Sequence, residues 1–151
     1  MSTRRVSVLN YKMTTADGSD SWGRVPFGRQ FDFYGDVETE LMILNDGDES
    51  LCLGYTDLEL LEDVYVGDQL EFRAEMTKIG ATSRTCKVTT YKTATLAARM
   101  GDTKAGEGAM HYFSEPKLIT RGTVVLVVPK EHQRGEQPSG LVVDPWRELS
   151  L

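Results

Sequence analysis

The sequence predicts an α+β protein in which one long helix packs against an antiparallel sheet. One segment with helical periodicity, residues 26–44, precedes four β-favouring runs. Turn-forming residues separate these runs, and strands joined in this meander order pair antiparallel to one another. With 151 residues, the chain has the size of one domain, residues 1–151, with a single core. Such a core requires the sheet to cover the apolar face of the helix.

The chain before the helix is expected to form one strand and one loop. Residues 5–13 alternate well enough between apolar and polar side chains for a half-buried strand. Residues 14–24 are rich in Ser, Thr, Asp and Gly, which is typical of a loop. Pro26 suits the first turn of a helix, because its missing N–H has no bond to lose there. We therefore expect the helix to begin at about Pro26.

The predicted helix has two faces with different side chains. Its large apolar residues fall within one arc at 100° per residue. They are Phe27, Phe31, Phe33, Tyr34, Val37, Leu41 and Leu44. The acidic residues Asp32, Asp36 and Glu40 follow one another at i, i+4 spacing on the opposite side. Gly28 and Gly35 lie beside them and would let a ligand or another chain approach the backbone.

The residues after the helix predict a sheet. Asn45–Gly47 end the helix with residues that tolerate a left-handed conformation. Residues 96–109 have the composition of a short helix or loop, and a polar tail over about 130–151 is expected to lie extended on the surface. The four β-favouring runs are residues 50–61, 68–79, 82–93 and 117–128.

Composition and charge narrow the classes of function. The net charge of −6 argues against a nucleic-acid partner, which would require a basic face. No apolar run approaches the roughly 18 residues of a membrane-spanning helix, and the N-terminal residues lack the apolar core of a secretory signal. We therefore expect a cytoplasmic protein without a membrane partner. Cys52 and Cys86 are expected to be buried thiols, and no His or Cys cluster has metal-ligand spacing.

Asp36 and Glu40 are the candidates for proton transfer. They lie one helical turn apart, so one carboxylate can take a proton while the other orients a group or stays protonated. Carboxylates at this spacing on a polar helix face are more often simply solvated. The residues alone leave both interpretations open.

The expected helix start at Phe27 and Gly28 is a second candidate site. Free N–H groups and the positive end of the helix dipole can polarise a bound carbonyl group at such a position. Every helix has such an end, so this signal is weak by itself. A third set of candidates is basic, because Arg84, Lys130 and Arg134 could hold the phosphates of a ligand.

Several motifs resemble those of the small hotdog-fold ammonia-lyases that act on 3-aminoacyl-CoA thioesters. Residues 35–41 match Gly-Asp-Val-x-Thr-Glu-Leu, and residues 64–68 match Val-Tyr-x-Gly-Asp. Residues 82–84 resemble a Thr-Ser-Arg of some members, and residues 133–135 match Gln-Arg-Gly. The resemblance extends over about residues 13–91 and returns in two short segments near the C-terminus.

The resemblance implies a hotdog fold, an antiparallel sheet wrapped around one long central helix. It implies elimination of ammonia, or another amine, from a 3-aminoacyl thioester, or the reverse addition to a 2-enoyl thioester. Asp36 and Glu40 would be the acid and base, while Phe27, Gly28 and Gly35 would hold the thioester. The acyl group would be carried on coenzyme A or on the phosphopantetheine of an acyl carrier protein, with no further cofactor. A homodimer or higher homo-oligomer would be the functional unit.

The chain departs from the family in the loop before the helix. The family has Asp-Ala-His-Tyr-x-Gly, and here Asp17 is kept while Ser19 and Asp20 replace His-Tyr and Trp22 replaces the glycine. In the family this loop lies against the thioester end of the pocket, so the change bears on which substrate and which amine the protein uses. A hotdog thioesterase is the alternative enzyme, because a carboxylate can also position water against the carbonyl. A non-catalytic acyl-thioester-binding subunit is the alternative outside enzymes.

Overall fold

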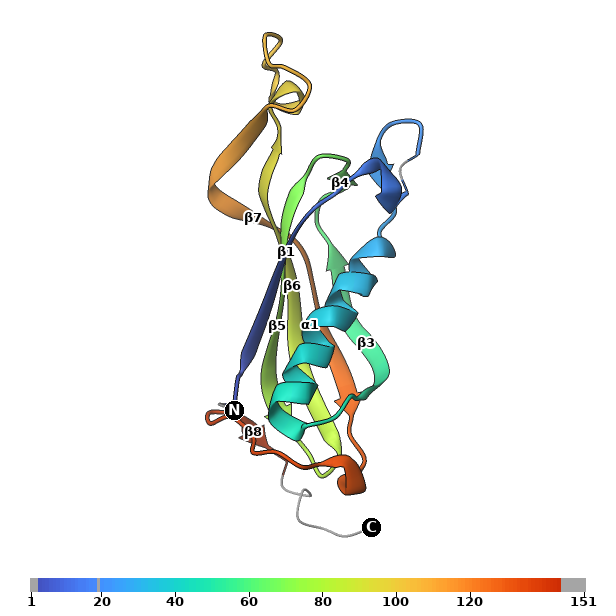
Figure 1. Ribbon diagram of the computed structural model, residues 1–151, viewed down its shortest axis with the longest axis vertical. Coiled ribbons are helices and arrows are strands. Elements are labelled where there is room, and N and C mark those ends of the chain that lie inside the picture. Colours follow the sequence, from blue (N-terminus) through green and yellow to red (C-terminus); the bar gives the residue numbers. More distant parts are fainter. Residues whose placement is uncertain (1–2, 19, 145–151) are drawn as a thin grey trace.

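The computed structural model describes residues 3–18 and 20–144 and consists of one helix lying across one large sheet (Figure 1). The helix is α1, Arg29–Asp46. The main path through the sheet has the order β1-β5-β6-β7-β3, and all neighbours along it are antiparallel. The strands are β1 (Val6–Lys12), β3 (Leu51–Leu60), β5 (Gln69–Ile79), β6 (Ser83–Leu96) and β7 (Met110–Val127). This arrangement confirms the predicted hotdog fold.

Three short helices and three short strands make up the rest of the regular structure in the described residues. Strand β2 (Arg24–Val25) pairs with β4 (Val64–Tyr65) beside the start of α1. Strand β8 (Val142–Val143) is parallel to the end of β5. The 3-10 helices are η1 (Thr15–Asp17), η2 (Ala97–Met100) and η3 (Lys130–His132).

Helix α1 begins three residues later than expected. The N–H groups of Arg29, Gln30 and Phe31 donate to the carbonyls three residues before them, so the chain at Pro26 forms a tight turn that leads into the helix. The helix also extends two residues past Leu44, because Asn45 and Asp46 are fully buried and paired with distant parts of the chain. Gly47 then ends it at a φ of 78°, in the left-handed region that glycine adopts without strain.

The core lies between the apolar arc of α1 and the inner face of the sheet. Phe33, Tyr34, Val37 and Leu41 are at most 5% exposed, which confirms most of the predicted arc. The ring of Phe33 stacks on Phe72 of β5 with centroids 4.7 Å apart. Complete burial of a side chain of this size stabilises a fold by about 1.5–3 kcal/mol, so this contact fixes the helix on β5.

The excursion predicted at residues 96–109 is the tip of a long hairpin arm. Strand β6 continues to Leu96, and β7 begins at Met110, which lies opposite Leu96 in the register. Helix η2 and the following turns close the tip. Figure 1 shows this arm standing clear of the rest of the sheet. Strand β7 therefore starts seven residues before the expected residue 117.

The C-terminal tail is anchored to the domain as far as Asp144. The side chain of Gln133 donates to the carbonyls of Ala81 and Val128, both at 2.9 Å. Gly135 packs so closely on the end of α1 that a side-chain carbon there would lie 2.2 Å from the carbonyl oxygen of Asn45. The Gln-Arg-Gly motif thus has a structural role, and the end of the predicted tail, 145–151, lies outside the described residues.

No helix in the described part of the chain combines the length and apolarity needed to cross a membrane.

Candidate active site

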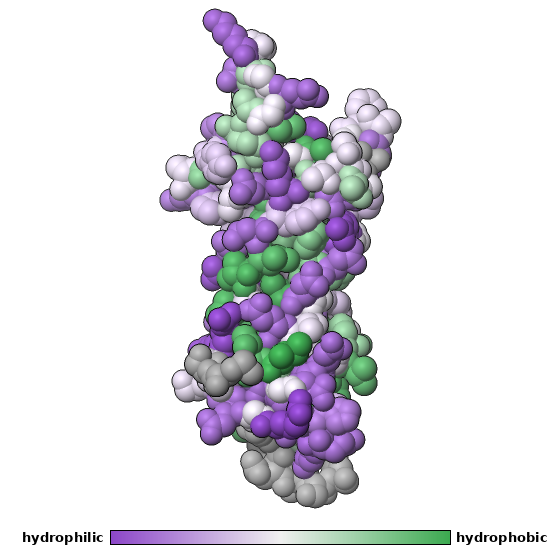
Figure 2. Space-filling model, viewed as in Figure 1, coloured by the Kyte–Doolittle hydropathy of each residue, from purple (hydrophilic) through white to green (hydrophobic). Residues whose placement is uncertain are grey.

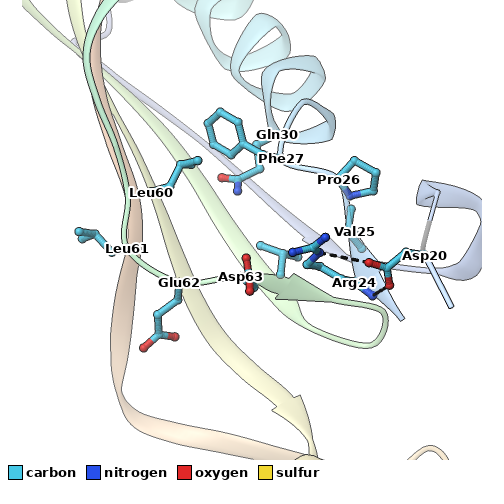
Figure 3. A pocket seen from close by; sticks show the side chains of 11 residues that line it. Asp20, Arg24, Val25, Pro26, Phe27, Gln30, Leu60, Leu61, Glu62 and Asp63 are labelled. Carbon is cyan, nitrogen blue, oxygen red and sulfur yellow. Dashed lines mark hydrogen bonds and ion pairs between the residues drawn. The ribbon is translucent and has the colours of Figure 1, made fainter. Parts of the chain in front are cut away.

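A cleft of about 580 Å³ opens between the start of α1 and the chain that links β3 to β4 (Figure 3). We call it the α1 cleft. Val25, Pro26 and Phe27 form one wall, and residues 60–64 form the other. Gln30 lies at the cleft beside Phe27. The site therefore has an apolar wall next to the helix start and a second wall that includes acidic side chains.

The Val-Tyr-x-Gly-Asp motif begins at Val64, where the second wall ends. Gly67 has a φ of 92°, and a side-chain carbon on it would lie 2.5 Å from Leu96. The buried carboxylate of Asp68 accepts from the backbone N–H of Tyr65 at 2.8 Å and pairs with Lys92 at 3.0 Å. The motif thus folds a tight, internally paired turn, and this turn positions the residues that face the cleft.

Asp17, the residue kept from the family loop, ties the start of α1 to β1. Its carboxylate accepts from Arg29 at 2.9 Å, from the Tyr11 hydroxyl at 3.0 Å and from the Thr14 N–H at 2.6 Å. Burial alone would raise the pKa of Asp17, but these hydrogen bonds outweigh it and hold the pKa below its usual value. Asp17 is therefore a structural anchor for the helix start.

The three predicted thioester-binding residues differ in their position relative to the α1 cleft. Phe27 is half-buried and lines the α1 cleft, and Gly28 is the exposed residue just before the helix. Gly35 is half-buried in the middle of α1, and no atom lies within 4 Å of where its side chain would begin. In the loop before the helix, Arg24 lines the cleft, whereas Trp22 is 82% exposed and does not.

Sequence reasoning missed Gln30, which is only 2% exposed although it lines the α1 cleft. Its Oε1 accepts a hydrogen bond from the Thr90 hydroxyl of β6 at 2.8 Å. The Thr90 hydroxyl is also hydrogen-bonded to the buried hydroxyl of Tyr34. Three polar groups from α1 and β6 therefore join inside the core, immediately behind the cleft.

Glu38 was missed as well. Its side chain is 4% exposed, and the Tyr55 hydroxyl of β3 donates to its Oε1 at 2.7 Å. Burial raises the pKa of Glu38 to about 7, against the opposing effect of this hydrogen bond. A carboxyl group with this pKa exists in both protonation states near neutral pH.

One pattern could have revealed both residues. Gln30, Tyr34 and Glu38 follow one another at i, i+4 spacing, so they form a stripe within the apolar arc. We call these three residues the inner polar stripe. Polar side chains on the face of a helix that packs on a sheet need partners there, whereas the acidic stripe that drew attention first faces outward.

Asp36 and Glu40 lie on that outer face and are exposed. Glu40 forms an ion pair with Arg4 at 2.6 Å, and Asp32 forms one with Arg29 at 2.5 Å. No hydrogen bond or ion pair joins Asp36 to another described residue. The outer position neither establishes nor removes a catalytic function, so the roles of Asp36 and Glu40 stay predictions.

The predicted phosphate site does not assemble in one chain. Arg84 is fully buried, and its Nε and Nη2 donate to the buried carboxylate of Asp46 at 2.9 and 2.8 Å. The expectation for Arg84 is thus corrected, because its guanidinium is not accessible to a phosphate. Lys130 and Arg134 are exposed, and Arg134 binds the Gly47 carbonyl just after α1. Both belong to the opposite end of the helix from the cleft.

No group of three or more His, Cys, Asp or Glu residues that could hold a metal ion occurs in the described part of the chain. Both cysteines are free thiols. Cys86 is buried as predicted, whereas the expectation for Cys52 is wrong, because it lies exposed on the edge strand β3.

Comparisons with known proteins agree with this geometry. No protein-family model matches the chain. The chain is 34% identical over 128 residues to a 3-aminobutyryl-CoA ammonia lyase from Acetoanaerobium sticklandii, a match that covers 85% of the chain and 98% of the relative. The structure of β-alanyl-CoA:ammonia lyase from Clostridium propionicum aligns with a TM-score of 0.79 and 33% identity over 95% of both chains. An acyl-CoA hydrolase from Staphylococcus aureus shares the fold at 12% identity, with a TM-score of 0.66 over 92% of this chain and 74% of that one.

Proposed function

Because the chain belongs to the family of hotdog-fold 3-aminoacyl-CoA ammonia-lyases, we propose that it eliminates ammonia, or another amine, from a 3-aminoacyl thioester. In this reaction a base removes a proton from C2, the C3–N bond breaks, and the amine leaves with a proton from an acid. The product is the 2-enoyl thioester, and the reverse reaction adds the amine to it. The observation that carries the proposal is similarity to two ammonia-lyases over nearly the whole chain.

The α1 cleft is the proposed place for the thioester. A carbonyl oxygen beside Phe27 and Gly28 would lie at the positive end of the helix dipole. Hydrogen-bond donors there stabilise the negative charge that develops on this oxygen when the C2 proton leaves. The carbonyl is thus activated by protein groups alone, and the proposed mechanism uses no metal or organic cofactor.

We propose that Asp36 and Glu40 transfer the protons at the cleft of a second protomer. Asp36 lies six residues beyond Gln30, which is about 9 Å along the helix axis and on a different face. Glu40 is one turn farther, so neither carboxylate points into the cleft of its own chain. Asp36 is the better placed of the two for this role, because Glu40 is already paired with Arg4.

The edge strand β3 supports a dimer as the functional unit. It ends the order of the main sheet, so one row of its backbone groups has no neighbouring strand among the described residues. It also carries exposed apolar side chains, namely Leu51, Leu53, Leu58 and Leu60, with Leu61 just after it. In Figure 2 apolar patches likewise interrupt the polar surface of the face in view. Pairing with a second protomer would satisfy this edge and cover these leucines.

We propose coenzyme A as the carrier, with carrier-protein phosphopantetheine as the second candidate. Lys130 and Arg134 could contact a carrier phosphate only from the far end of α1, because 18 helical residues span about 27 Å. We also propose that the enzyme acts in the cytoplasm, because coenzyme A thioesters and acyl carrier proteins are used there.

The products formed from β-alanyl-CoA and 3-aminobutyryl-CoA test the proposal. We expect release of ammonia together with an enoyl thioester, and retention of the thioester absorbance. Release of the free thiol with an intact 3-amino acid would instead show a thioesterase, the activity named for the Staphylococcus aureus relative of the same fold. Activity lost on chelation and restored by a metal ion would contradict the proposed mechanism.

A further inference from the structure

We infer that the side-chain amide of Gln30 donates a hydrogen bond to the thioester carbonyl oxygen in the α1 cleft. The inference rests on the proposed function in one respect, the thioester substrate. It adds a residue outside the matched motifs to the group that polarises the carbonyl. The basis of the inference is that the Gln30 amide is buried and that hydrogen bonds through Thr90 and Tyr34, on the core side of the cleft, fix its orientation.

The buried proton of Tyr34 sets the direction of the chain of hydrogen bonds. Tyr34 is fully buried, and burial raises the pKa of its hydroxyl, so the hydroxyl keeps its proton. The Thr90 hydroxyl is the side-chain group hydrogen-bonded to it among the described residues. A buried O–H group is costly to leave without an acceptor, so Tyr34 donates to Thr90.

The orientation of Gln30 follows from this. Since Thr90 accepts from Tyr34, its own proton is directed to the Oε1 atom of Gln30, 2.8 Å away. The amide oxygen of Gln30 is thereby occupied, and its NH₂ group is left over. This group forms no hydrogen bond with another described residue. Figure 3 shows the Gln30 amide beside Phe27, on the side where the cleft is open.

The rest of the cleft indicates to which ligand atom the NH₂ group of Gln30 donates. Gln30 is the second residue of α1, so a carbonyl oxygen bound by its amide also lies at the positive end of the helix dipole. On the opposite wall the carboxylate of Asp63 lies toward the cleft, whereas Glu62 points away from Gln30 and pairs with Lys92 at 4.0 Å (Figure 3). Carboxylates repel a developing enolate oxygen and attract a protonated amine. The substrate is therefore oriented with its carbonyl toward Gln30 and its 3-amino group toward that acidic wall.

A bound analogue that cannot react provides a direct test. The probe is butyryl-CoA in which a methylene group replaces the thioester sulfur and the carbonyl carbon is ¹³C. It can be neither hydrolysed nor deaminated, and a hydrogen bond to its carbonyl lowers the infrared stretching frequency. We expect a lowered frequency with the wild-type protein and a clearly higher one with Gln30→Leu, in which only the donors at the helix start remain. Thr90→Val should give an intermediate frequency, because the Gln30 amide is still present but its orientation is no longer fixed by the hydrogen bond from Thr90.

Thr120→Val is the matched control. Thr120 lies directly opposite Thr90 on β7, is equally buried, and its hydroxyl has no partner among the described residues. This variant should leave the carbonyl frequency and the turnover unchanged. Gln30→Leu should lower kcat by about 100- to 1,000-fold, as loss of one oxyanion donor does, with little change in KM. Gln30→Met, which keeps the length of the side chain but has no hydrogen-bond donor, makes the same test if the leucine variant does not fold.

The outcomes separate this inference from the proposed function. A Gln30-dependent carbonyl shift in a protein that eliminates no amine would overturn the proposed function and leave the inference standing. An unchanged carbonyl frequency in folded Gln30→Leu or Gln30→Met would overturn the inference. An equal loss of the frequency shift in Thr90→Val and Thr120→Val would also overturn it. A rise in KM with unchanged kcat would also overturn it, because the contact would then bind the ground state only.

Discussion

At the residue scale, Glu38 couples the protonation of the core to the stability of the fold. Its pKa is raised from 4.5 in the unfolded chain to about 7 in the folded protein. The folded state thus binds the proton more tightly than the unfolded state. The stabilising contribution of the protonated group is complete below pH 4.5 and is lost as the pH rises through 7.

We therefore expect Glu38→Gln to stabilise the protein at alkaline pH by about 3 kcal/mol and to change little at acidic pH. The glutamine keeps an oxygen that can accept from Tyr55 but has no charge to desolvate. Urea unfolding at pH 4.5 and pH 8.5, at one protein concentration, measures the difference. Parallel pH dependences in the wild type and the variant would show that Glu38 is not the titrating group.

Substitutions of the outer carboxylates test the proton-transfer proposal at the same scale. Asp36→Asn and Glu40→Gln keep the shape of each side chain, so each should leave the fold intact and slow turnover by roughly two to four orders of magnitude. Asp32→Asn, one turn earlier on the same stripe, is the control and should have a smaller effect. If all three variants turn over like the wild type, the stripe is only a solvated face.

At the scale of elements, a buried ion pair fastens the end of α1 to β6. The Arg84–Asp46 pair is at most 1% exposed, and Gln137 of the tail donates to the same carboxylate at 2.6 Å. Removing one partner of such a pair leaves a buried charge without compensation. The Thr-Ser-Arg and Gln-Arg-Gly motifs thus meet at the end of α1. The basic residues of these motifs hold this end of the helix in place, and they do not form a phosphate site together.

Arg84→Ala should accordingly destabilise the fold by about 3–5 kcal/mol. The KM for a coenzyme A thioester should change little in the fraction that stays folded, because the guanidinium does not reach solvent. Thermal unfolding combined with steady-state kinetics checks both points, and Lys130→Ala is the exposed control for stability. A large rise in KM without loss of stability would restore Arg84 to the phosphate site.

The elements also show what the sequence alone could predict. The apolar arc of α1 and the β-favouring runs depend on local spacing, and they identified the helix and the sheet. The site depends on pairs that local spacing cannot reveal, since Thr90 and Gln30 are 60 residues apart and Arg84 and Asp46 are 38 apart. Periodicity drew attention to the exposed stripe of Asp36 and Glu40. The buried polar residues of α1 can be recognised as a site only when their partners on the sheet are known.

At the scale of the whole molecule, the proposed site needs two protomers. Gln30 and Phe27 line the cleft of one chain, whereas Asp36 and Glu40 face away from it. The exposed leucines of β3 offer the surface on which a second chain would pair. The proposal therefore requires that Asp36 of one protomer transfer a proton at the cleft that contains Gln30 of the other protomer.

Mixed dimers test this sharing of residues. In a hybrid of an Asp36→Asn chain and a Gln30→Leu chain, one site would carry both substitutions and the other would carry neither. After random exchange, half of the dimers are hybrids with one intact site in two, so about one quarter of wild-type turnover should return. Sites formed within single chains would show no recovery, and light scattering would report a monomer if the chains do not associate at all.

The central claim is carbon–nitrogen bond chemistry on an acyl thioester, and the reverse reaction tests it most directly. The 2-butenoyl thioester of coenzyme A is incubated with the wild-type protein and ¹⁵N-labelled ammonium, and the acyl thioester is examined by mass spectrometry. We expect 3-aminobutyryl-CoA that carries ¹⁵N, with no free coenzyme A released. Release of free coenzyme A without incorporation of ¹⁵N would contradict the assignment as an ammonia-lyase.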